Sequence, residues 1–132
     1  MEIEDISNAK LRLADEKDEQ CEKEFQRGRN KVKQGDLHTA KEIFSSLTMR
    51  GHSKAMTYLA IMYMKGKGVD QNTNRGLSLL LSAARLGDVD AMSELGDVFK
   101  SKGDMRTSME WHRKAADRGS VYSKNLFEST NL

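Results

Sequence analysis

The 132-residue chain has no proline, one cysteine and few aromatic residues, which make up 6% of it. Without proline, the residue that most strongly interrupts a helix is absent, so long helices are permitted. Because Cys21 is alone, no intramolecular disulfide forms, and we expect a protein of a reducing compartment, the cytoplasm. The longest apolar run, residues 58–64, is far shorter than the ~20 residues that cross a bilayer, and the acidic first residues do not resemble a secretory signal.

Motifs for catalysis or metal binding are also missing from the sequence. His38, His52, His112 and Cys21 show neither i, i+4 pairing nor a C-x-x-C spacing, so no metal site is predicted. No G-x-S-x-G nucleophile motif occurs, and the carboxylates of "DEKDEQ" form a charge run typical of a solvated helix face. We therefore expect a protein that is not an enzyme and needs no cofactor.

Charge is unevenly distributed along the chain. The formal net charge is +2, but residues 1–24 carry −5 and the remainder carries +7. This asymmetry indicates either an acidic arm that meets its own basic body or a basic surface for an acidic partner. The length fits one domain, and we divide the chain into an acidic arm or amphipathic helix at residues 1–18 and a single repeat domain at residues 19–132.

An internal repeat dominates the rest of the sequence. The segment "GHSKAMTYLAIMY", which starts at Gly51, aligns with "GDVDAMSELGDVF", which starts at Gly87. A second alignment places "GDLHTAKEIFSSLTMRG", from Gly35, over "GDMRTSMEWHRKAADRG", from Gly103. The glycines at 51, 87 and 119 then recur at intervals of 36 and 32 residues, which is the period of helix-turn-helix solenoids.

Local signals support a division into helices. Candidate N-caps are Ser53, Asp88, Asp104 and Ser120, and candidate left-handed C-terminal positions are Gly51, Gly87 and Gly119. We expect helices at residues 20–34, 37–50, 53–64, 74–86, 88–102, 105–118 and 120–128. The predicted fold is all-α, a short right-handed α-solenoid of about three helix-turn-helix repeats plus a terminal helix. Gly28, Ala60 and Gly96 share one repeat position, where paired helices need close backbone approach.

The glycine pair in "KGKGVDQN" has two interpretations, a phosphate cradle or a turn between helices. A cradle requires the glycines to follow a strand and to precede a helix, with a lysine and a hydroxyl placed as in G-x-x-x-x-G-K-[ST]. Here the glycines follow a predicted helix, and the second repeat exceeds the third by four residues at this stretch. The sequence therefore favours a lengthened turn.

The second and third units resemble a known family. "AMTYLAIMYMKGKGVDQNTNRGLSLLLSAARLGD" is similar to a Sel-1-like repeat, a branch of the tetratricopeptide-like repeats, and "SMEWHRKAADRG" resembles the closing helix of another. Trp111 falls where the family pattern has a packing tryptophan. The first unit is closer to a plain tetratricopeptide repeat and has Arg27 and Lys31 where a leucine and an aromatic residue are usual. The resemblance implies a non-catalytic scaffold that binds proteins.

In such a solenoid the first helix of each pair lines the concave face. Partner-binding positions on this basis are Phe25, Arg29, Val32, Lys33, Lys54, Thr57, Ile61, Met64, Lys65, Asp97 and Lys100, with Asp90 and Ser93 beside them. If exposed, Phe25, Val32, Ile61 and Met64 form an apolar patch that marks an interaction site. The alternative is that the protein itself covers them, for example with the N-terminal segment that carries Ile3, Ile6 and Leu13.

Two functions remain open on the sequence alone. One is a module that binds a protein or peptide, acidic or amphipathic in character, through its concave face. The other is an immunity protein that neutralises a secreted bacterial toxin by covering its active site. Nucleic acid is disfavoured as a partner because exposed aromatic residues for base stacking are sparse. No membrane partner is expected, and a short array of this kind is predicted to be a monomer or a weak dimer.

Overall fold

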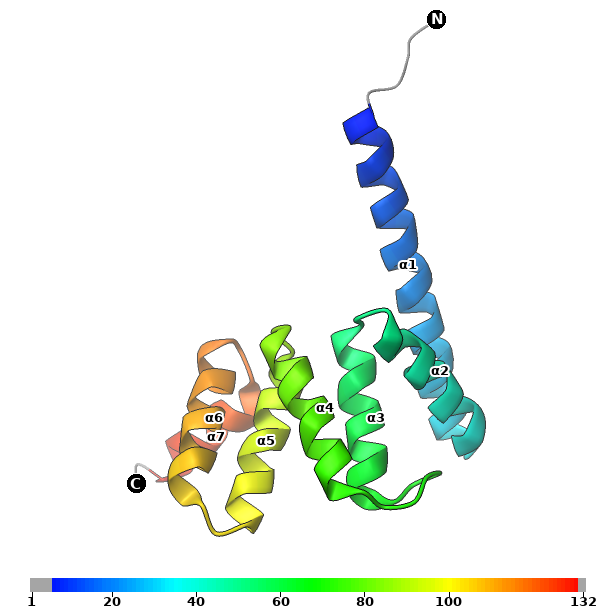
Figure 1. Cartoon of the computed structure of the whole chain (residues 1–132). Coiled ribbons are helices and arrows are strands. Elements are labelled where there is room, and N and C mark those ends of the chain that lie inside the picture. The colour runs from blue at the N-terminus through cyan, green and yellow to red at the C-terminus, as the bar shows by residue number, and fades with distance from the viewer. Residues whose placement is uncertain (1–5, 131–132) are drawn as a thin grey trace, which may run out of the picture.

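The computed structural model describes residues 6–130, which form seven α-helices and no strand (Figure 1). The helices are α1 (Ile6–Lys33), α2 (Leu37–Met49), α3 (Ser53–Lys65), α4 (Thr73–Arg85), α5 (Val89–Ser101), α6 (Met105–Asp117) and α7 (Val121–Thr130). The all-α array of helical pairs predicted from the sequence is confirmed. None of these helices is long and apolar enough to cross a membrane.

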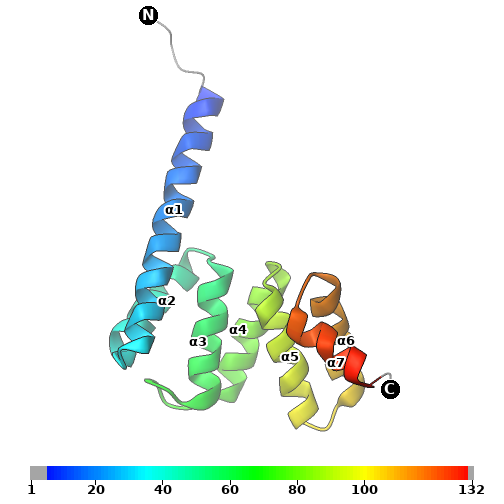
Figure 2. The same ribbon diagram turned by 180° about the vertical axis from the view of Figure 1, so that it is seen from behind.

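The helices pair in chain order and form two layers. Helix α1 packs on α2, α3 on α4, and α5 on α6, while α7 packs on α6 at the end of the array. Figure 2 shows α1, α3 and α5 on one side of the array, with α2, α4 and α6 behind them. The first helices of the three pairs therefore share one face, as a solenoid requires.

Helix α1 is longer than the sequence suggested. It runs unbroken from Ile6, rather than from about Gln20, and its first half projects from the body of the array (Figures 1 and 2). No proline or glycine interrupts it before Gly28, and the contacts of Lys23 with Glu19 and of Gln26 with Glu22 support the exposed surface at i, i+4 spacing. Residues 6–18 of the predicted arm are thus continuous with the helix of the first repeat, while residues 1–5 lie outside the described part of the chain.

The helix ends follow the predicted turn chemistry with one exception. Gly51, Gly87 and Gly119 have φ angles of 81°, 94° and 102°, in the left-handed region that favours glycine. The N-cap predicted at Ser53 is wrong, because His52 takes that place. Its Nδ1 atom accepts a hydrogen bond from the amide of Ala55 at 3.2 Å, so an imidazole replaces the usual hydroxyl or carboxylate.

Two apolar cores lie side by side, and α3 contributes to both. The first core joins α1, α2 and α3, and the second joins α3, α4, α5 and α6. Buried members of the first are Cys21, Phe25, Ala40, Ile43, Phe44, Leu47, Ala55, Leu59 and Met62. Those of the second are Met56, Ala60, Leu80, Ala83, Ala84, Ala91, Met92, Leu95 and Ala115. Trp111 packs against the second core, as the resemblance implied.

Small residues set the distance between paired helices. A Cβ atom on Gly28 would lie 2.6 Å from the Phe44 ring, and one on Gly96 would lie 2.4 Å from the His112 ring. Ala60, at the same repeat position, is completely buried, and its carbonyl oxygen would lie 3.0 Å from a Cβ atom on Gly76 of the paired helix. The close approach predicted for this position is therefore present in all three pairs.

The stretch at residues 66–72 is a turn, which settles the question that its glycine pair raised. Gly66 ends α3 in the left-handed conformation, with φ of 67°. The amide of Asn72 donates to the carbonyl of Tyr63 at 2.8 Å, which closes the turn. A Cβ atom on Gly68 would lie 2.7 Å from Cβ of Leu37, so this turn packs tightly on the start of α2.

A buried polar contact links neighbouring repeats. Asp88 is 8% exposed, and its Oδ2 atom accepts hydrogen bonds from the Thr57 hydroxyl at 2.6 Å and from the amide of Ala91 at 3.1 Å. The first bond reaches back to α3, and the second caps α5. One carboxylate therefore fixes the position of α5 against the preceding repeat.

We predict that Asp88→Ala lowers the free energy of unfolding by about 2–4 kcal/mol, because it removes both a helix cap and a charge-assisted hydrogen bond. Chemical denaturation measures the change. Asp104→Ala is the matched control, since Asp104 caps α6 in the same way through Thr107 but lies exposed. An equal loss in the two variants would contradict the role assigned to the Thr57 contact.

Candidate protein-binding groove

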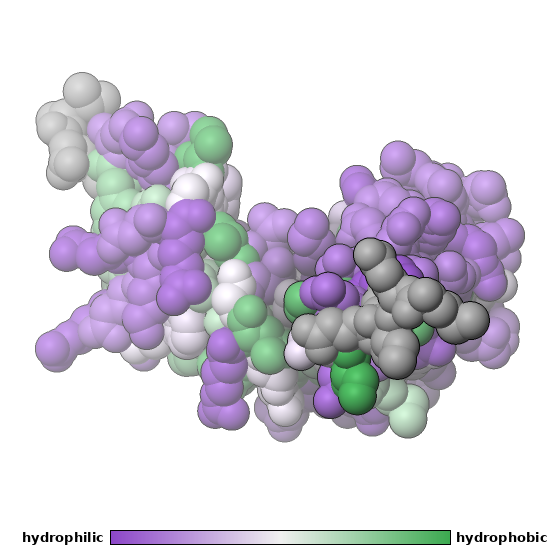
Figure 3. Space-filling model, turned by 90° about the horizontal axis from the view of Figure 1, so that it is seen from above, coloured by the Kyte–Doolittle hydropathy of each residue, from purple (hydrophilic) through white to green (hydrophobic). Residues whose placement is uncertain are grey.

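A groove of about 430 Å³ lies on the concave face, between α1, α3 and α5. Its lining residues are Phe25, Gln26 and Arg29 from α1, Lys54, Thr57, Tyr58 and Ile61 from α3, and Asp88, Asp90 and Glu94 from α5 and its cap. Figure 3 views the molecule from the side of the projecting arm and shows its outline indented between the two ends of the array. Most of the surface in that view is hydrophilic, with hydrophobic residues in small groups.

Part of the groove consists of positions that the sequence predicted to bind a partner. Among the positions predicted to bind a partner, Phe25, Arg29, Lys54, Thr57 and Ile61 all line it. Phe25 and Arg29 lie on α1, and the other three residues lie on α3. The stacking of the helical pairs brings these two groups together.

Phe25 does not form an exposed anchor, contrary to expectation. It is 3% exposed, and its ring centroid lies 5.1 Å from that of His52, 5.3 Å from Tyr58 and 5.9 Å from Phe44. The projecting helix α1 presses this ring into the first core. Phe25 therefore forms the floor of the groove, and its main role is in packing.

Other predicted positions lie outside the groove. Val32 packs against the first core, and Met64 turns toward α4, where its sulfur would lie 2.5 Å from a Cβ atom on Gly76. Asp97 accepts hydrogen bonds from the hydroxyl of Tyr122 on α7, at 2.9 and 3.1 Å. Ser93, expected on the concave face, is buried against α7.

Three predicted lysines lie at the C-terminal ends of the first helices of the three pairs. Lys33, Lys65 and Lys100 are exposed and lie in the last turns of α1, α3 and α5. These helix ends lie at the same side of the array in Figure 2. Cations at helix C-termini interact favourably with the helix dipole. We call Lys33, Lys65 and Lys100 the basic edge.

Sequence reasoning missed two features of the groove. Tyr58 lines its centre, and the guanidinium carbon of Arg29 lies 6.0 Å from the centroid of the Tyr58 ring. Asp88 was recognised as a cap, but its reach to Thr57 was not. Tyr58 directly follows Thr57, which was assigned to the concave face, and this position in the helix was the available signal that Tyr58 lines the groove. A contact between residues 31 apart in sequence had no local signal.

Opposite charges line the two sides of the groove. Arg29 and Lys54 stand on the side of α1 and the start of α3, and Asp90 and Glu94 stand on α5. Burial raises the pKa of Glu94, and the nearby carboxylates of Asp97 and Asp90 raise it further, while Lys65 opposes them. Glu94 is thus a partly desolvated carboxylate among acidic neighbours, a setting that favours a cation brought by a ligand.

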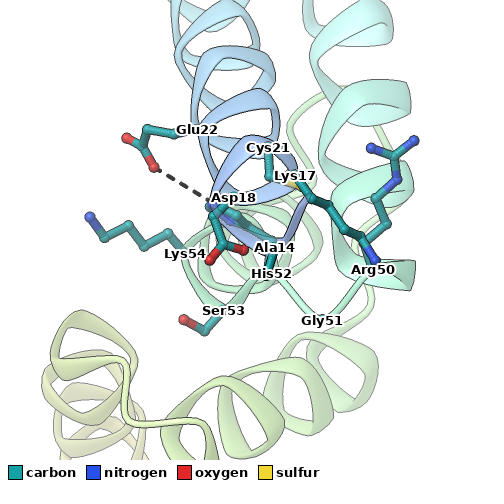
Figure 4. Close-up of a pocket in the computed structure, with 10 residues that line it drawn as sticks. All are labelled: Ala14, Lys17, Asp18, Cys21, Glu22, Arg50, Gly51, His52, Ser53 and Lys54. Atoms are coloured by element: carbon teal, nitrogen blue, oxygen red, sulfur yellow. Dashed lines mark ion pairs between the residues drawn. The ribbon is translucent and has the colours of Figure 1, made fainter. Parts of the chain in front are cut away.

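A second hollow, of about 450 Å³, separates the projecting half of α1 from the turn between α2 and α3 (Figure 4). Cys21, buried and unpaired, lies at its inner side. Nε2 of His52 lies 3.8 Å from Oε2 of Glu22. Figure 4 shows Lys54 and Glu22 extending to one side and Arg50 to the other. Because these charged groups diverge, the hollow does not present a convergent set of ligands.

A Ser-His-Asp combination occurs at the other end of the array but is buried. His112 Nδ1 lies 2.9 Å from the Ser123 hydroxyl, and His112 Nε2 lies 3.2 Å from Asp97 Oδ1 without a well-directed hydrogen bond. Ser123 is completely buried, so its hydroxyl cannot meet a substrate. The contact of Ser123 with Ser93, at 2.9 Å, completes a chain of polar contacts that fixes α7 to α5 and α6. Within residues 6–130 no group of three or more His, Cys, Asp or Glu side chains is arranged to hold a metal ion.

We predict that Glu94→Gln stabilises the protein at neutral pH and not in acid. A raised pKa in the folded state means that folding disfavours the ionised form. Below the ordinary pKa of 4.5 the carboxyl is protonated in both states and this cost is absent; the cost appears as the pH rises through the folded-state pKa.

Denaturation at a series of pH values measures this difference. Glu110→Gln, on the exposed surface of α6, is the control for loss of a negative charge away from the groove. A difference between wild type and Glu94→Gln that stays constant from acid to neutral pH would contradict the assignment.

Comparison with known proteins agrees with this architecture. The Sel1 repeat model matches residues 53–88 and 89–120, together more than half of the chain. Among curated proteins, none matches the sequence. The fold is similar to that of a Sel1 repeat protein from Oxalobacter formigenes, with 22% identity and a TM-score of 0.71 over 78% of this chain and 45% of that one.

A second solved structure shares the fold. It is a protective antigen present in uropathogenic Escherichia coli strains that displays an SLR fold, with 23% identity and a TM-score of 0.71 over 81% of this chain. The present chain spans a quarter of that antigen and under half of the Oxalobacter protein. At these identities the two structures establish the fold alone. With two repeats matched by the family model and three helical pairs in one array, the chain belongs to the Sel1 repeat family.

Proposed function

We propose that this protein is a non-catalytic interaction module that binds a segment of a partner protein in its concave groove. Sel1 repeat proteins generally mediate protein–protein interaction. The observation that carries the proposal is the groove itself, in which Tyr58 and Ile61 form an apolar centre between opposite charges. Such an arrangement fits a short segment with an apolar anchor and charges on both sides of it.

The groove residues would have distinct roles in binding. Ile61 is only partly buried, so an apolar side chain of the partner can cover it. Arg29 and Lys54 would orient an acidic group, and Asp90 and Glu94 a basic one. The basic edge would extend the site for an acidic continuation of the partner. The proposal thus narrows the expected acidic or amphipathic partner to a segment that carries both signs of charge.

The immunity-protein alternative differs in the number of partners rather than in the surface used. An inhibitor of a toxin would bind one protein tightly and stoichiometrically, whereas an adaptor would bind several proteins more weakly. We further propose a cytoplasmic location, supported by the single cysteine, which is buried and unpaired. Neither proposal requires a cofactor.

The test is capture of proteins from a lysate of the source cells by the intact chain and by groove variants. Ile61→Asp and Lys54→Glu should each reduce capture of the specific partner at least tenfold, as measured by quantitative mass spectrometry. Phe25 is unsuitable for this purpose, because a polar residue at a position 3% exposed would unfold the first core.

Met49→Asp serves as the matched control for an apolar-to-charged change. Met49 ends α2 and is 90% exposed, away from the groove. The Met49→Asp variant should capture the same proteins as the intact chain. Circular dichroism should show equal helix content in all variants. If the groove variants and the control capture the same proteins in equal amounts, the concave groove is not the binding site. One stoichiometric partner would identify an inhibitor, and several would identify an adaptor.

A further inference from the structure

The projecting half of α1, residues 6–20, is the least explained part of the molecule. Every residue from Lys10 to Gln20 is exposed, and Ile6, Leu11 and Leu13 are 72%, 65% and 60% exposed. A helical stretch of this length is marginally stable in water unless an apolar side packs against something. We call residues 6–20 the arm. Its exposed leucines and isoleucine are therefore available to pack against another protein surface.

The arm has an apolar stripe with flanking charges. Ile6, Ala9 and Leu13 recur at i, i+3 and i+7 and therefore share one side of the helix. Lys10 lies beside the stripe, between Ala9 and Leu13, and Arg12 also precedes Leu13. Carboxylates follow Leu13, at Asp15, Glu16, Asp18 and Glu19, with Lys17 among them. Around Leu13 the arm thus presents cations on the N-terminal side and mostly anions on the C-terminal side. Ile3, which the sequence reading placed in the same stripe, lies outside the described residues.

The groove has the matching arrangement. Asp90 and Glu94 can face a cation such as Lys10. Tyr58 and Ile61 can contact an apolar side chain such as Leu13. Lys54 can pair with a carboxylate of the arm. The groove, of about 430 Å³, can receive an apolar anchor from a helix that lies across it. The charge order and the apolar centre therefore fit an arm of this composition.

The arm cannot reach the groove of its own molecule. Helix α1 is continuous from the arm to Phe25 and Arg29, which themselves line the groove, and neither proline nor glycine provides a hinge between them. The arm points away from the array in both views (Figures 1 and 2). This geometry excludes an arrangement in which residues 6–20 lie in the groove of their own molecule. A second copy of the chain has no such constraint.

We propose that the arm of one copy docks in the concave groove of a second copy, so that two chains exchange arms in a reciprocal pair. The proposal rests on the proposed function, because it assigns an occupant to the same groove. Each copy gives one arm and receives one, which closes the assembly with twofold symmetry. The arm then competes with any partner protein for the groove, and dissociation of the pair exposes the binding site.

Sedimentation velocity of the full-length chain over a range of concentrations tests the exchange. Wild type and the control Met49→Asp should form a dimer as concentration rises. An arm variant, Ile6→Asp with Leu13→Asp, and the groove variant Ile61→Asp should each dimerise at least tenfold more weakly. Lys54→Glu is a second groove variant. Because Lys54 is exposed, this substitution tests the groove without disturbing the fold.

Mixing the variants makes the test specific for an arm in a groove. The arm variant keeps an intact groove and the groove variant keeps an intact arm, so the two should associate with each other although neither associates with itself. A wild type that stays monomeric at all concentrations overturns the proposal. So does a dimer that survives the groove variants, since it would indicate that arms pair with arms, and so does a failure of the mixed variants to associate.

The outcomes also separate this proposal from the one on which it rests. If wild type is monomeric but the groove variants lose a captured partner, only the arm exchange is wrong. If the groove variants alter neither self-association nor capture, both proposals fail.

Discussion

The array depends on α3, because this helix contributes to two cores and to the groove at once. Leu59 and Met62 enter the first core, and Met56 and Ala60 enter the second. A third side of the helix carries Tyr58 and other groove residues. A short repeat array cannot bury the apolar face of any one pair alone, so a shared helix is what makes its halves interdependent. The groove is consequently held by the same helix that joins the cores.

Much of this fold could be predicted from the sequence because its determinants are local and repeated. Glycines at 51, 87 and 119 end helices, and the small residues at 28, 60 and 96 allow the pairs to approach. The start of α1 was misplaced because the charged segment before Gln20 has no proline or other local signal that marks where the helix begins. The cap at His52 was missed because histidine rarely takes that role, for which serine and aspartate are the usual choices.

The groove was harder to predict than the fold, because side-chain direction depends on contacts between repeats. Arg29 and Ile61, which the register assigned to the concave face, line the groove, but the register could not show that α1 buries Phe25. Likewise, the bond from Asp88 to Thr57 joins residues that only the packed array brings together. Periodicity gives the face on which a residue lies, whereas the depth at which it lies depends on the neighbouring helices. This depth separates residues that pack from residues available to bind.

The groove between α1, α3 and α5 is the surface that we propose binds other proteins. The most direct measurement is photo-crosslinking in the source cells with a photoreactive amino acid at the Ile61 position, compared with the same group at the exposed Met49 position on α2. If the groove binds other proteins, position 61 gives defined crosslinked species and position 49 gives none. Crosslinks that form only from position 49, or equally from both, would contradict this proposal.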